Sequence, residues 1–203
     1  MACTLLLVAY RWVNPPATTV QIEKAVTAAI AGEPFRYRYQ PVAQSGQDAD
    51  VRHAAVASED GRFYTHSGFD WEEVRRARED AEQRGRPMRG ASTITQQLVK
   101  NLFLTTHRSW VRKGFEVPLT LLAELILPKE RILSLYLDVA EWGPGVFGIE
   151  AASEYHYGVD ADALSRDRAA RLVACLPNPI ERRPQDMGRT ASRIETRMRQ
   201  MGW

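Results

Sequence analysis

Cysteine, lysine and long apolar runs are all scarce in this chain of 203 residues. The two cysteines, Cys3 and Cys175, are too few for a disulfide framework or a cysteine metal cluster. Cys175 lies in the apolar run LVACL and is expected to be a small core residue. We find no internal repeat, no low-complexity tract and no stretch of the roughly 20 apolar residues that a spanning helix needs. Many-pass membrane proteins, fibres and disordered tails are therefore excluded.

The composition that is present is ordinary for one globular domain, with 44% hydrophobic residues, 26% charged residues and a net charge of +2. Only four lysines occur, against 23 arginines. Arginine binds carboxylate and phosphate groups in a two-pronged geometry. A genome rich in arginine codons would give the same ratio, so only the positions of individual arginines can indicate a function.

The first 13 residues, MACTLLLVAYRWV, are apolar except for Thr4 and Arg11. The stretch is too short to cross a bilayer and lacks the basic start and the cleavage site of a signal peptide. Two interpretations stay open. The stretch is either an element packed on the domain, or the end of a membrane anchor with Arg11 and Trp12 at the interface.

Apolar residues recur at intervals of three and four along most of the chain, which predicts a mainly α protein. Thr18 or Thr19 is expected to cap a helix that runs to about Ala31. Pro118 is expected to kink or split its helix, and 84–90 to form a loop. The other expected elements are a short strand or extended segment at 35–39 and helices at 51–58, 71–83, 93–104, 109–127, 129–139, 165–176 and 189–201.

A first candidate site is the segment EDGRFYTHSG, which carries Glu59, Asp60, Phe63 and His66. Isolated acidic pairs are usually solvated surface. Here the pair follows an apolar helical pattern, and a carboxylate at the end of such a helix can be desolvated. Desolvation raises the pKa of a carboxyl group and suits it to act as a general base.

A second candidate is the segment GASTITQQLVKN. Thr93 and Gln96 have the spacing of a capping box, which is by itself a structural feature. Gln97 and Lys100 share one face of the expected helix near its N-terminus, where the helix dipole favours anions, and Ser92 adds a hydroxyl group. The segment indicates a binding site for a phosphate or a sugar.

A third segment, RSWVRKGFE, combines Arg108, Arg112 and Lys113 with Glu116. Surface pairs four residues apart, such as Arg112 and Glu116, are common and stabilise a helix only slightly. Three cations beside one glutamate, with Lys100 upstream, would nevertheless hold an anion strongly. Spacing alone cannot show whether Glu116 meets the first acidic segment in space.

Together, the three segments resemble the signature blocks of the peptidoglycan glycosyltransferases, glycosyltransferase family 51. A fourth block, KERILSLYLD, is also similar, with Ser134 and Asp138 where the family usually has Glu and Asn. The resemblance covers roughly residues 50–180. It is closest to the monofunctional biosynthetic members, because VAEWG at 139–143 is similar to that subgroup and no penicillin-binding transpeptidase stretch follows Trp203.

This resemblance implies a mainly α, lysozyme-like head lobe with a smaller jaw lobe that faces the membrane. Residues 1–16 would be a truncated membrane anchor and linker, and 17–203 the glycosyltransferase domain on the outer, periplasmic face of the cytoplasmic (inner) membrane. The implied substrates are lipid II and a growing glycan on undecaprenyl diphosphate. The GlcNAc 4-hydroxyl of lipid II attacks the anomeric carbon of the growing chain, which inverts as the lipid diphosphate leaves.

The resemblance also implies roles for individual residues. Glu59 would be the catalytic base, and Glu116 would hold a cation or organise a divalent metal, Mg²⁺ or Mn²⁺, on the diphosphate. No organic cofactor or nucleic acid is expected, and other cell-wall synthesis proteins are candidate partners. The implied substrate-binding positions form two sets. Three would hold their loop: Asp60, Phe63 and His66. The others would face the diphosphate or the sugars: Ser92, Thr93, Gln97, Lys100, Arg108, Arg112 and Lys113.

Two other functions stay open. A lytic enzyme on a lysozyme-like fold would also place a glutamate in a sugar groove, but hydrolysis of a neutral glycan does not need the cation set around Lys100. An inactive module that binds lipid II or a partner protein is the other alternative. The presence of both glutamates argues against it, while Ser134 and Asp138 keep it open.

Overall fold

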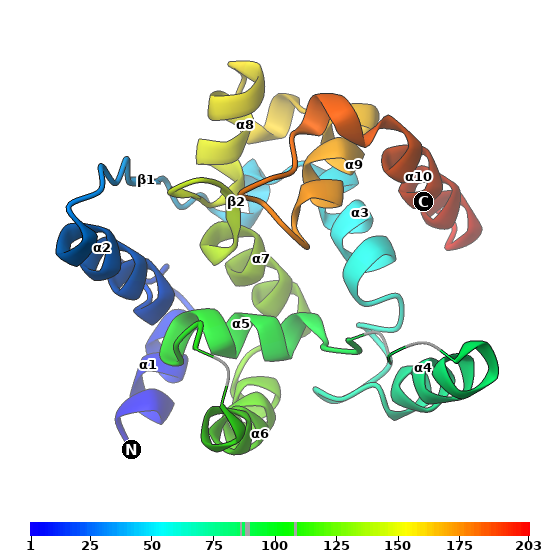
Figure 1. Cartoon of the computed structure of the whole chain (residues 1–203), viewed down its shortest axis with the longest axis horizontal. Helices are drawn as coiled ribbons and strands as arrows, with labels where there is room; N and C mark the ends of the chain where they lie inside the picture. The colour runs from blue at the N-terminus through cyan, green and yellow to red at the C-terminus, as the bar shows by residue number, and fades with distance from the viewer. Residues whose placement is uncertain (86, 88–89, 108) are drawn as a thin grey trace.

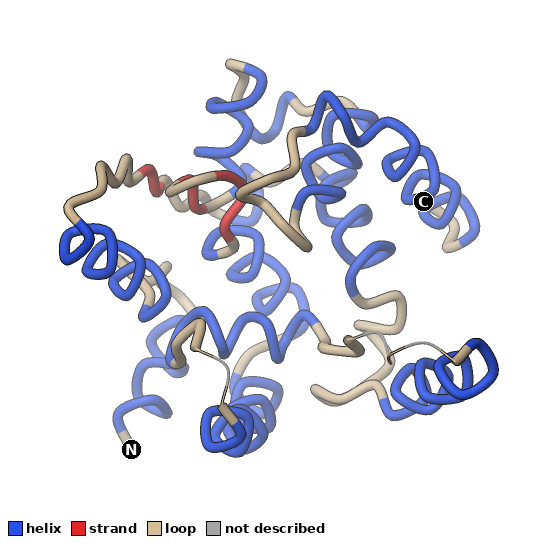
Figure 2. Tube along the Cα trace, in the orientation of Figure 1, coloured by secondary structure: helices blue, strands red, loops and turns tan. Residues whose placement is uncertain are grey.

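The computed structural model describes the whole chain except residues 86, 88–89 and 108. Helices dominate it, so the predicted mainly α class is confirmed (Figure 2). In chain order the helices are α1 (Ala2–Tyr10), α2 (Thr19–Ala31), α3 (Ala49–Glu59), α4 (Trp71–Arg84), α5 (Ile94–Phe103), α6 (Trp110–Ile126), α7 (Lys129–Val139), α8 (Ile149–Tyr157), α9 (Arg166–Cys175) and α10 (Gly188–Gln200). Three short strands, β1 (Arg38–Tyr39), β2 (Glu141–Gly143) and β3 (Val146–Phe147), form a sheet in the order β1-β3-β2, with β1 parallel and β2 antiparallel to β3.

Two groups of helices flank the central helix α7 (Figure 1). In the first group α3, α9 and α10 pack against one another. In the second group α5 packs between α6 and α7, and α2 packs on α5. Helix α7 is buried along its whole length from Ile132 to Val139, including Ser134 and Asp138. The candidate catalytic segments lie on α3, α5 and α6, so the packing around α7 brings both groups to one site.

Local capping explains where several predicted helices begin. Thr18 accepts a hydrogen bond from the backbone N–H of Gln21, and the Gln21 side chain accepts one from the Thr18 N–H. The same reciprocal box forms between Thr93 and Gln96 at the start of α5. Each box satisfies backbone donors that the first helical turn leaves free.

Pro118 lies inside α6, which continues unbroken from Trp110 to Ile126, so the expectation that it splits the helix was wrong. A proline lacks the N–H that would bond the carbonyl four residues earlier. Packing of α1, α5 and α7 against α6 offsets the loss of this one hydrogen bond. Below the proline, the Thr120 hydroxyl donates to the Glu116 carbonyl oxygen at 2.7 Å.

The N-terminal helix α1 packs on α6. Its Leu7 and Tyr10 are buried, and the Tyr10 ring stacks on Phe103 of α5. The Arg131 guanidinium donates to the carbonyl oxygens of Tyr10 and Val13, both at 2.7 Å. The structure therefore shows this segment packed on the domain. Over the described residues no helix is both long and apolar enough to span a bilayer.

The loop between α3 and α4 packs tightly on α6 at Gly68. Its φ of +93° is a conformation that only glycine adopts readily. A Cβ at this position would lie 2.8 Å from Thr120 Cγ2, which is closer than carbon atoms pack. A side chain here would therefore push the loop, with His66, away from α6.

Candidate active site

Glu59 is the last residue of α3, and its carboxylate is half-buried at the end of an apolar helix. Its Oε2 accepts a hydrogen bond from Gln97 Nε2 at 3.1 Å, and its Oε1 accepts one from the Ser58 hydroxyl at 3.4 Å. Burial raises the pKa of Glu59, while these two hydrogen bonds and the charge of Arg182 oppose the rise. A carboxylate that is desolvated in this way has a stronger tendency to take a proton.

Gln97 is held in one orientation between two partners. Its Nε2 donates to Glu59, and its Oε1 accepts a hydrogen bond from the Tyr136 hydroxyl at 3.2 Å. Tyr136 is fully buried in α7, so its hydroxyl has a fixed position. An ionised carboxylate can only accept hydrogen bonds, so Glu59 sets which end of the Gln97 amide faces it, and the Tyr136 hydroxyl then donates to the amide oxygen.

Asp60 ties the loop after α3 to the start of α5. Its carboxylate accepts the backbone N–H of Ile94 and the His66 Nε2–H, both at 3.0 Å. His66 Nδ1 accepts the Gly68 N–H at 3.1 Å, which leaves the ring proton on Nε2. The Thr93 hydroxyl completes the junction by donating to the Gly68 carbonyl oxygen at 2.7 Å.

Glu116 is 3% exposed and is surrounded by donors. Arg112 Nη1 donates to its Oε2 at 3.1 Å, and Lys113 Nζ donates to its Oε1. Gln96 Nε2 donates to Oε1 at 3.3 Å. The buried Nε of Arg112 has no hydrogen-bond partner among the described residues, so this guanidinium keeps a free donor.

Two consecutive residues of α5 bring the glutamates into one site. Gln96 holds Glu116 and Gln97 holds Glu59, each through its side-chain amide N–H. Consecutive helical residues point in different directions, so α5 separates the two carboxylates while fixing both. This arrangement answers the question that sequence spacing left open.

Lys100 stands between two hollows on either side of this part of α5. One hollow, of about 380 Å³, is lined by Ser92, Arg112, Lys113 and Glu116 among others. The other hollow has a volume of about 240 Å³ and is lined by Tyr136 among others. Gln97 and Lys100 line both hollows. Burial lowers the pKa of Lys100, and Glu116 opposes the change.

The predicted site residues fall into two groups. Glu59 is joined to the larger hollow by its hydrogen bond with Gln97. The hollow itself is lined by Ser92, Gln97, Lys100, Arg112, Lys113 and Glu116, among others. Phe63 is fully buried. The polar side-chain atoms of Asp60, His66 and Thr93 form hydrogen bonds within the junction between the loop after α3 and the start of α5. These four residues hold the loop rather than face the hollows, and Arg108 lies outside the described residues.

Several residues at the site were not assigned a role from the sequence. Tyr136 orients Gln97, and Arg182, fixed by a hydrogen bond to the Ala174 carbonyl oxygen at 2.9 Å, places its charge near Glu59. Thr106 lines both hollows, and Lys24 and Glu141 form an ion pair in the wall of the smaller one. The signal for Tyr136 was its place in the fourth family-like block, KERILSLYLD, to which no site role was given.

The charge of Glu116 is balanced by protein cations rather than left free for a metal ion. Its two oxygens already accept hydrogen bonds from Arg112, Lys113 and Gln96, and the positive charge of Lys100 lies close enough to interact with it. Protein carboxylates that bind Mg²⁺ or Mn²⁺ present free oxygen lone pairs to the ion. Among the described residues no cluster of three or more His, Cys, Asp or Glu side chains has the geometry of a metal site.

Comparison with known proteins gives matches over most of the chain. Residues 24–202 match the family described as Transglycosylase. The biosynthetic peptidoglycan transglycosylase of Pseudomonas putida (strain W619) is 48% identical over 179 residues, which cover 87% of this chain and 75% of that protein. The protein of the same name from Chromohalobacter salexigens is 45% identical over 98% of this chain and 86% of its own length. The one from Pseudomonas aeruginosa is 45% identical over 89% of this chain and 78% of its own length.

Proposed function

The chain belongs to the transglycosylase family, and from this premise we propose that it polymerises lipid II into the glycan strands of peptidoglycan. The observation that carries the proposal is the pairing on α5: Gln97 holds a desolvated glutamate, and Gln96 holds a glutamate encircled by cations. Polymerisation of labelled lipid II by the purified protein tests it.

In the proposed reaction the GlcNAc 4-hydroxyl of lipid II attacks the anomeric carbon of the growing chain. The new C–O bond forms as the bond to the lipid diphosphate breaks, and the hydroxyl proton passes to the Glu59 carboxylate. An alcohol is a poor nucleophile, so removal of its proton during attack lowers the barrier. The raised pKa of Glu59 suits it to this step.

The leaving diphosphate gains negative charge as the bond breaks. Lys100, Arg112 and Lys113 meet around one carboxylate, so positive charge is in excess in the larger hollow. Fixed cations stabilise such charge without having to reorganise during the reaction. In this role Glu116 positions Arg112 and Lys113 and takes no proton.

A substitution tests this role of Glu116. Glu116→Gln leaves Arg112 and Lys113 without their carboxylate, and we expect kcat/KM for lipid II to fall on the order of 100-fold. The acid limb of the pH–rate profile is expected to persist, because Glu59 still titrates. The measurement is a pH series of initial rates. Unchanged turnover would remove Glu116 from the mechanism, and loss of the limb would make it the proton carrier.

Glu82→Gln is the matched control for this variant. Glu82 also accepts a hydrogen bond from an arginine four residues away, Arg78, but on the exposed surface of α4. Exposed pairs of this kind contribute little to stability. Turnover by Glu82→Gln is therefore expected to equal that of the unchanged protein.

We propose that a divalent cation at the diphosphate is bound mainly by phosphate oxygens, because the charge of Glu116 is already balanced by Arg112 and Lys113. The larger hollow supplies cations and side-chain amides, which suit an anion. Such an ion would neutralise charge on the leaving group.

The rival functions fit these contacts less well. Hydrolysis of a neutral glycan does not require the cations that form ion pairs with Glu116. A catalytically inactive binding module does not require a desolvated glutamate held by Gln97. Products separate the three functions: long glycan supports the polymerase, short fragments from preformed glycan support a lytic enzyme, and binding without turnover supports a module.

An apolar surface on α1 and α6 is proposed to face the membrane that carries the lipid substrate. Helices α1 and α6 pack together at one end of the molecule (Figure 1). Exposed apolar patches of this extent mark interaction sites, and Trp and Phe side chains suit the headgroup region. The surface comprises Leu5, Leu6, Val8, Trp12 and Val13 near α1 and Trp110, Val111, Phe115, Val117, Leu121 and Leu125 on α6.

Two changes on this surface are expected to weaken membrane binding. Phe115 is 61% exposed and Leu125 is 82% exposed. The double variant Phe115→Glu with Leu125→Glu should lower sedimentation with phosphatidylglycerol vesicles at least about tenfold, because burial of each apolar side chain contributes roughly 1.5–3 kcal/mol. Tyr155→Glu on α8, at the opposite end of the molecule, is the control. An equal loss in both variants, or no loss in either, would contradict the proposal.

Peptidoglycan synthesis takes place outside the cytoplasm, so we place the catalytic domain on the outer face of the cytoplasmic membrane. In this proposal α1 is the end of the membrane anchor. Its exposed residues and its packing on α6 support a position at the membrane surface.

A further inference from the structure

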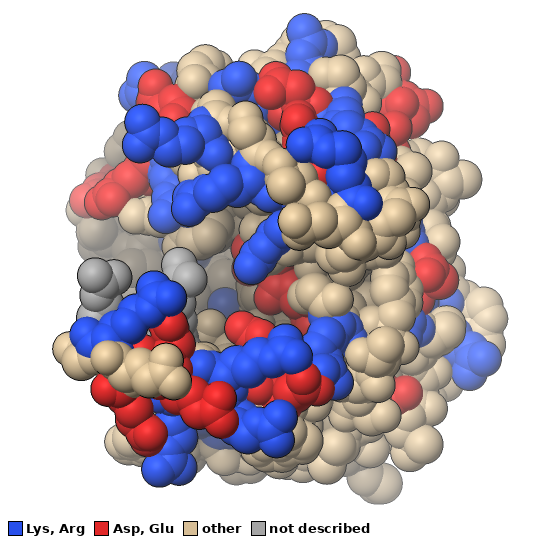
Figure 3. All heavy atoms as spheres, turned by 90° about the vertical axis from the view of Figure 1, so that its right-hand side faces the viewer, with Lys and Arg blue, Asp and Glu red and all other residues tan. Residues whose placement is uncertain are grey.

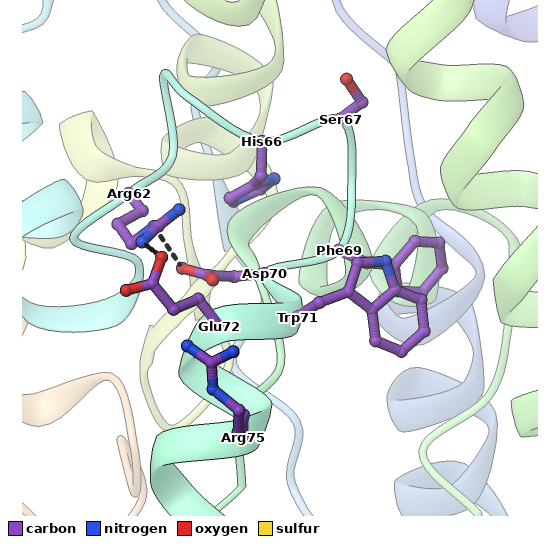
Figure 4. A pocket seen from close by; sticks show the side chains of 8 residues that line it. All are labelled: Arg62, His66, Ser67, Phe69, Asp70, Trp71, Glu72 and Arg75. Carbon is purple, nitrogen blue, oxygen red and sulfur yellow. Dashed lines mark ion pairs between the residues drawn. The ribbon is translucent and has the colours of Figure 1, made fainter.

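A separate polar hollow lies between the loop after α3 and the first turn of α4 (Figure 4). Its volume is about 490 Å³, which is in the range of small-molecule sites. Among the described lining residues it has none in common with the two hollows that flank Lys100. None of the roles proposed above for the reacting groups uses this space.

Polar groups on one wall of this hollow are held in place. The Arg62 guanidinium forms ion pairs with Asp70 and Glu72, and His66 is fixed by Asp60. Arg62 Nε is buried at 3.5 Å from Asp70 Oδ2 but makes no hydrogen bond among the described residues. The Arg62 side chain is 40% exposed and the Glu72 side chain 31% exposed, so both can also form hydrogen bonds with a ligand in the hollow.

The opposite wall is aromatic. Trp71 is 72% exposed, and its ring stacks on Phe69 with a centroid distance of 5.5 Å and an interplanar angle of 22°. Figure 4 shows the indole on one side of the hollow and Arg62, Asp70 and Glu72 on the other. The stacked pair presents a flat apolar face whose orientation is already fixed.

The charges around the hollow balance. Arg62 and Arg75 face Asp70 and Glu72, so neither sign dominates. Along α4 the acidic and basic side chains alternate as ion pairs, and Figure 3 shows them mixed over this side of the molecule. A phosphate would be poorly matched here, whereas a neutral ligand with many hydroxyl groups would find both donors and acceptors.

We propose that this hollow binds a saccharide segment of a glycan strand. The apolar C–H face of a sugar would lie on Trp71, and its hydroxyl groups would bond Arg62, Asp70 and Glu72. The identification of the saccharide as peptidoglycan glycan rests on the proposed function, whereas the match to a polyhydroxylated ligand rests on the hollow itself. The site would hold a strand away from the reacting groups.

The test uses peptide-free GlcNAc–MurNAc oligosaccharides of four and eight sugars, without lipid, added to the full chain. Binding is followed by NMR through the indole N–H signals, with the Trp71 signal assigned from Trp71→Phe. We expect saturable shifts of the Trp71 signal and about tenfold weaker binding for Trp71→Ala, the loss typical of a central aromatic contact. Trp110→Ala removes an indole that is 93% exposed on α6 and is expected to bind normally.

The outcomes separate this inference from the polymerase function. Binding is read without lipid II and through the Trp71 signal alone, so it does not depend on polymerase activity. No saturable shift, an equal loss in Trp110→Ala, or perturbation of the Trp71 signal by phosphatidylglycerol vesicles in place of saccharide would overturn the proposal. The polymerisation assay with Trp71→Ala shows which strand the hollow binds. Glycan products shorter than those of the unchanged protein indicate the nascent strand, and products of unchanged length indicate a preformed strand.

Discussion

Glu59→Gln is expected to lower the rate of lipid II polymerisation by about 10²- to 10⁴-fold, which is the contribution of a positioned general base. Glutamine can still accept the hydrogen bond from Gln97, so the surroundings of α3 should be kept. It cannot take the proton of the attacking hydroxyl. Because ionised Glu59 is desolvated, removing its charge should not lower the stability of the fold at neutral pH.

The pH dependence gives an independent check on Glu59. Only the ionised carboxylate can act as a base, so activity falls as the pH falls through its pKa. Burial raises that pKa, and the acid limb of kcat/KM should therefore lie above the range of an ordinary glutamate. Glu154→Gln, an exposed change on α8, is the control and should keep both the rate and the limb. Near-normal glycan synthesis by Glu59→Gln would exclude Glu59 as the base.

Helix α2 shows which parts of the fold local sequence can predict. Its start depends on Thr18 and Gln21, and its end on Gly32, which adopts a left-handed conformation. All three signals lie within or beside the helix and could be read from the sequence. Helix α8 and the pairing of β1 with β3 were missed, because α8 has only nine residues and the strand partners lie far apart in the sequence.

Prediction of the site was limited by the same difference between local and distant contacts. The sequence motifs indicated Glu59, Gln97 and Glu116, but only the packing of α5 between α6 and α7 shows that Gln96 and Gln97 hold one glutamate each. The expected role of Thr93 changed because its hydroxyl meets the Gly68 carbonyl, a contact across 25 positions. Burial of that kind cannot be read from spacing.

Asp138 is a second buried carboxylate, at the junction between α7 and the N-terminal segment. Its Oδ2 accepts Asn14 Nδ2 at 3.0 Å, and its Oδ1 accepts Gln47 Nε2 at 3.1 Å and the Val42 N–H at 3.3 Å. Burial raises the pKa of Asp138 to about 7, although these hydrogen bonds and Arg131 oppose the rise. The folded protein therefore holds a proton here that the unfolded chain, with an ordinary aspartate, releases near pH 4.

This difference predicts that stability falls as the pH rises. The contribution of protonated Asp138 is complete below the pKa of the unfolded chain and is lost as the pH passes through about 7. Between pH 5 and 8 the loss should be about 3 kcal/mol, or roughly 6–10 °C in Tm for a chain of this size. Asp138→Asn carries no titrating group at this position and should show a much flatter dependence.

Thermal unfolding at a series of pH values, in the Glu59→Gln background, isolates the effect because Glu59 also has a raised pKa. Asp162→Asn, an exposed change, is the control and should keep the full slope. Parallel curves for Asp138→Asn and its parent would show that the proton is held elsewhere. If the curves diverge from about pH 4 upward and become parallel above about pH 7, one residue of α7 links the stability of the fold to the protonation of the N-terminal junction, through Asn14 and Gln47.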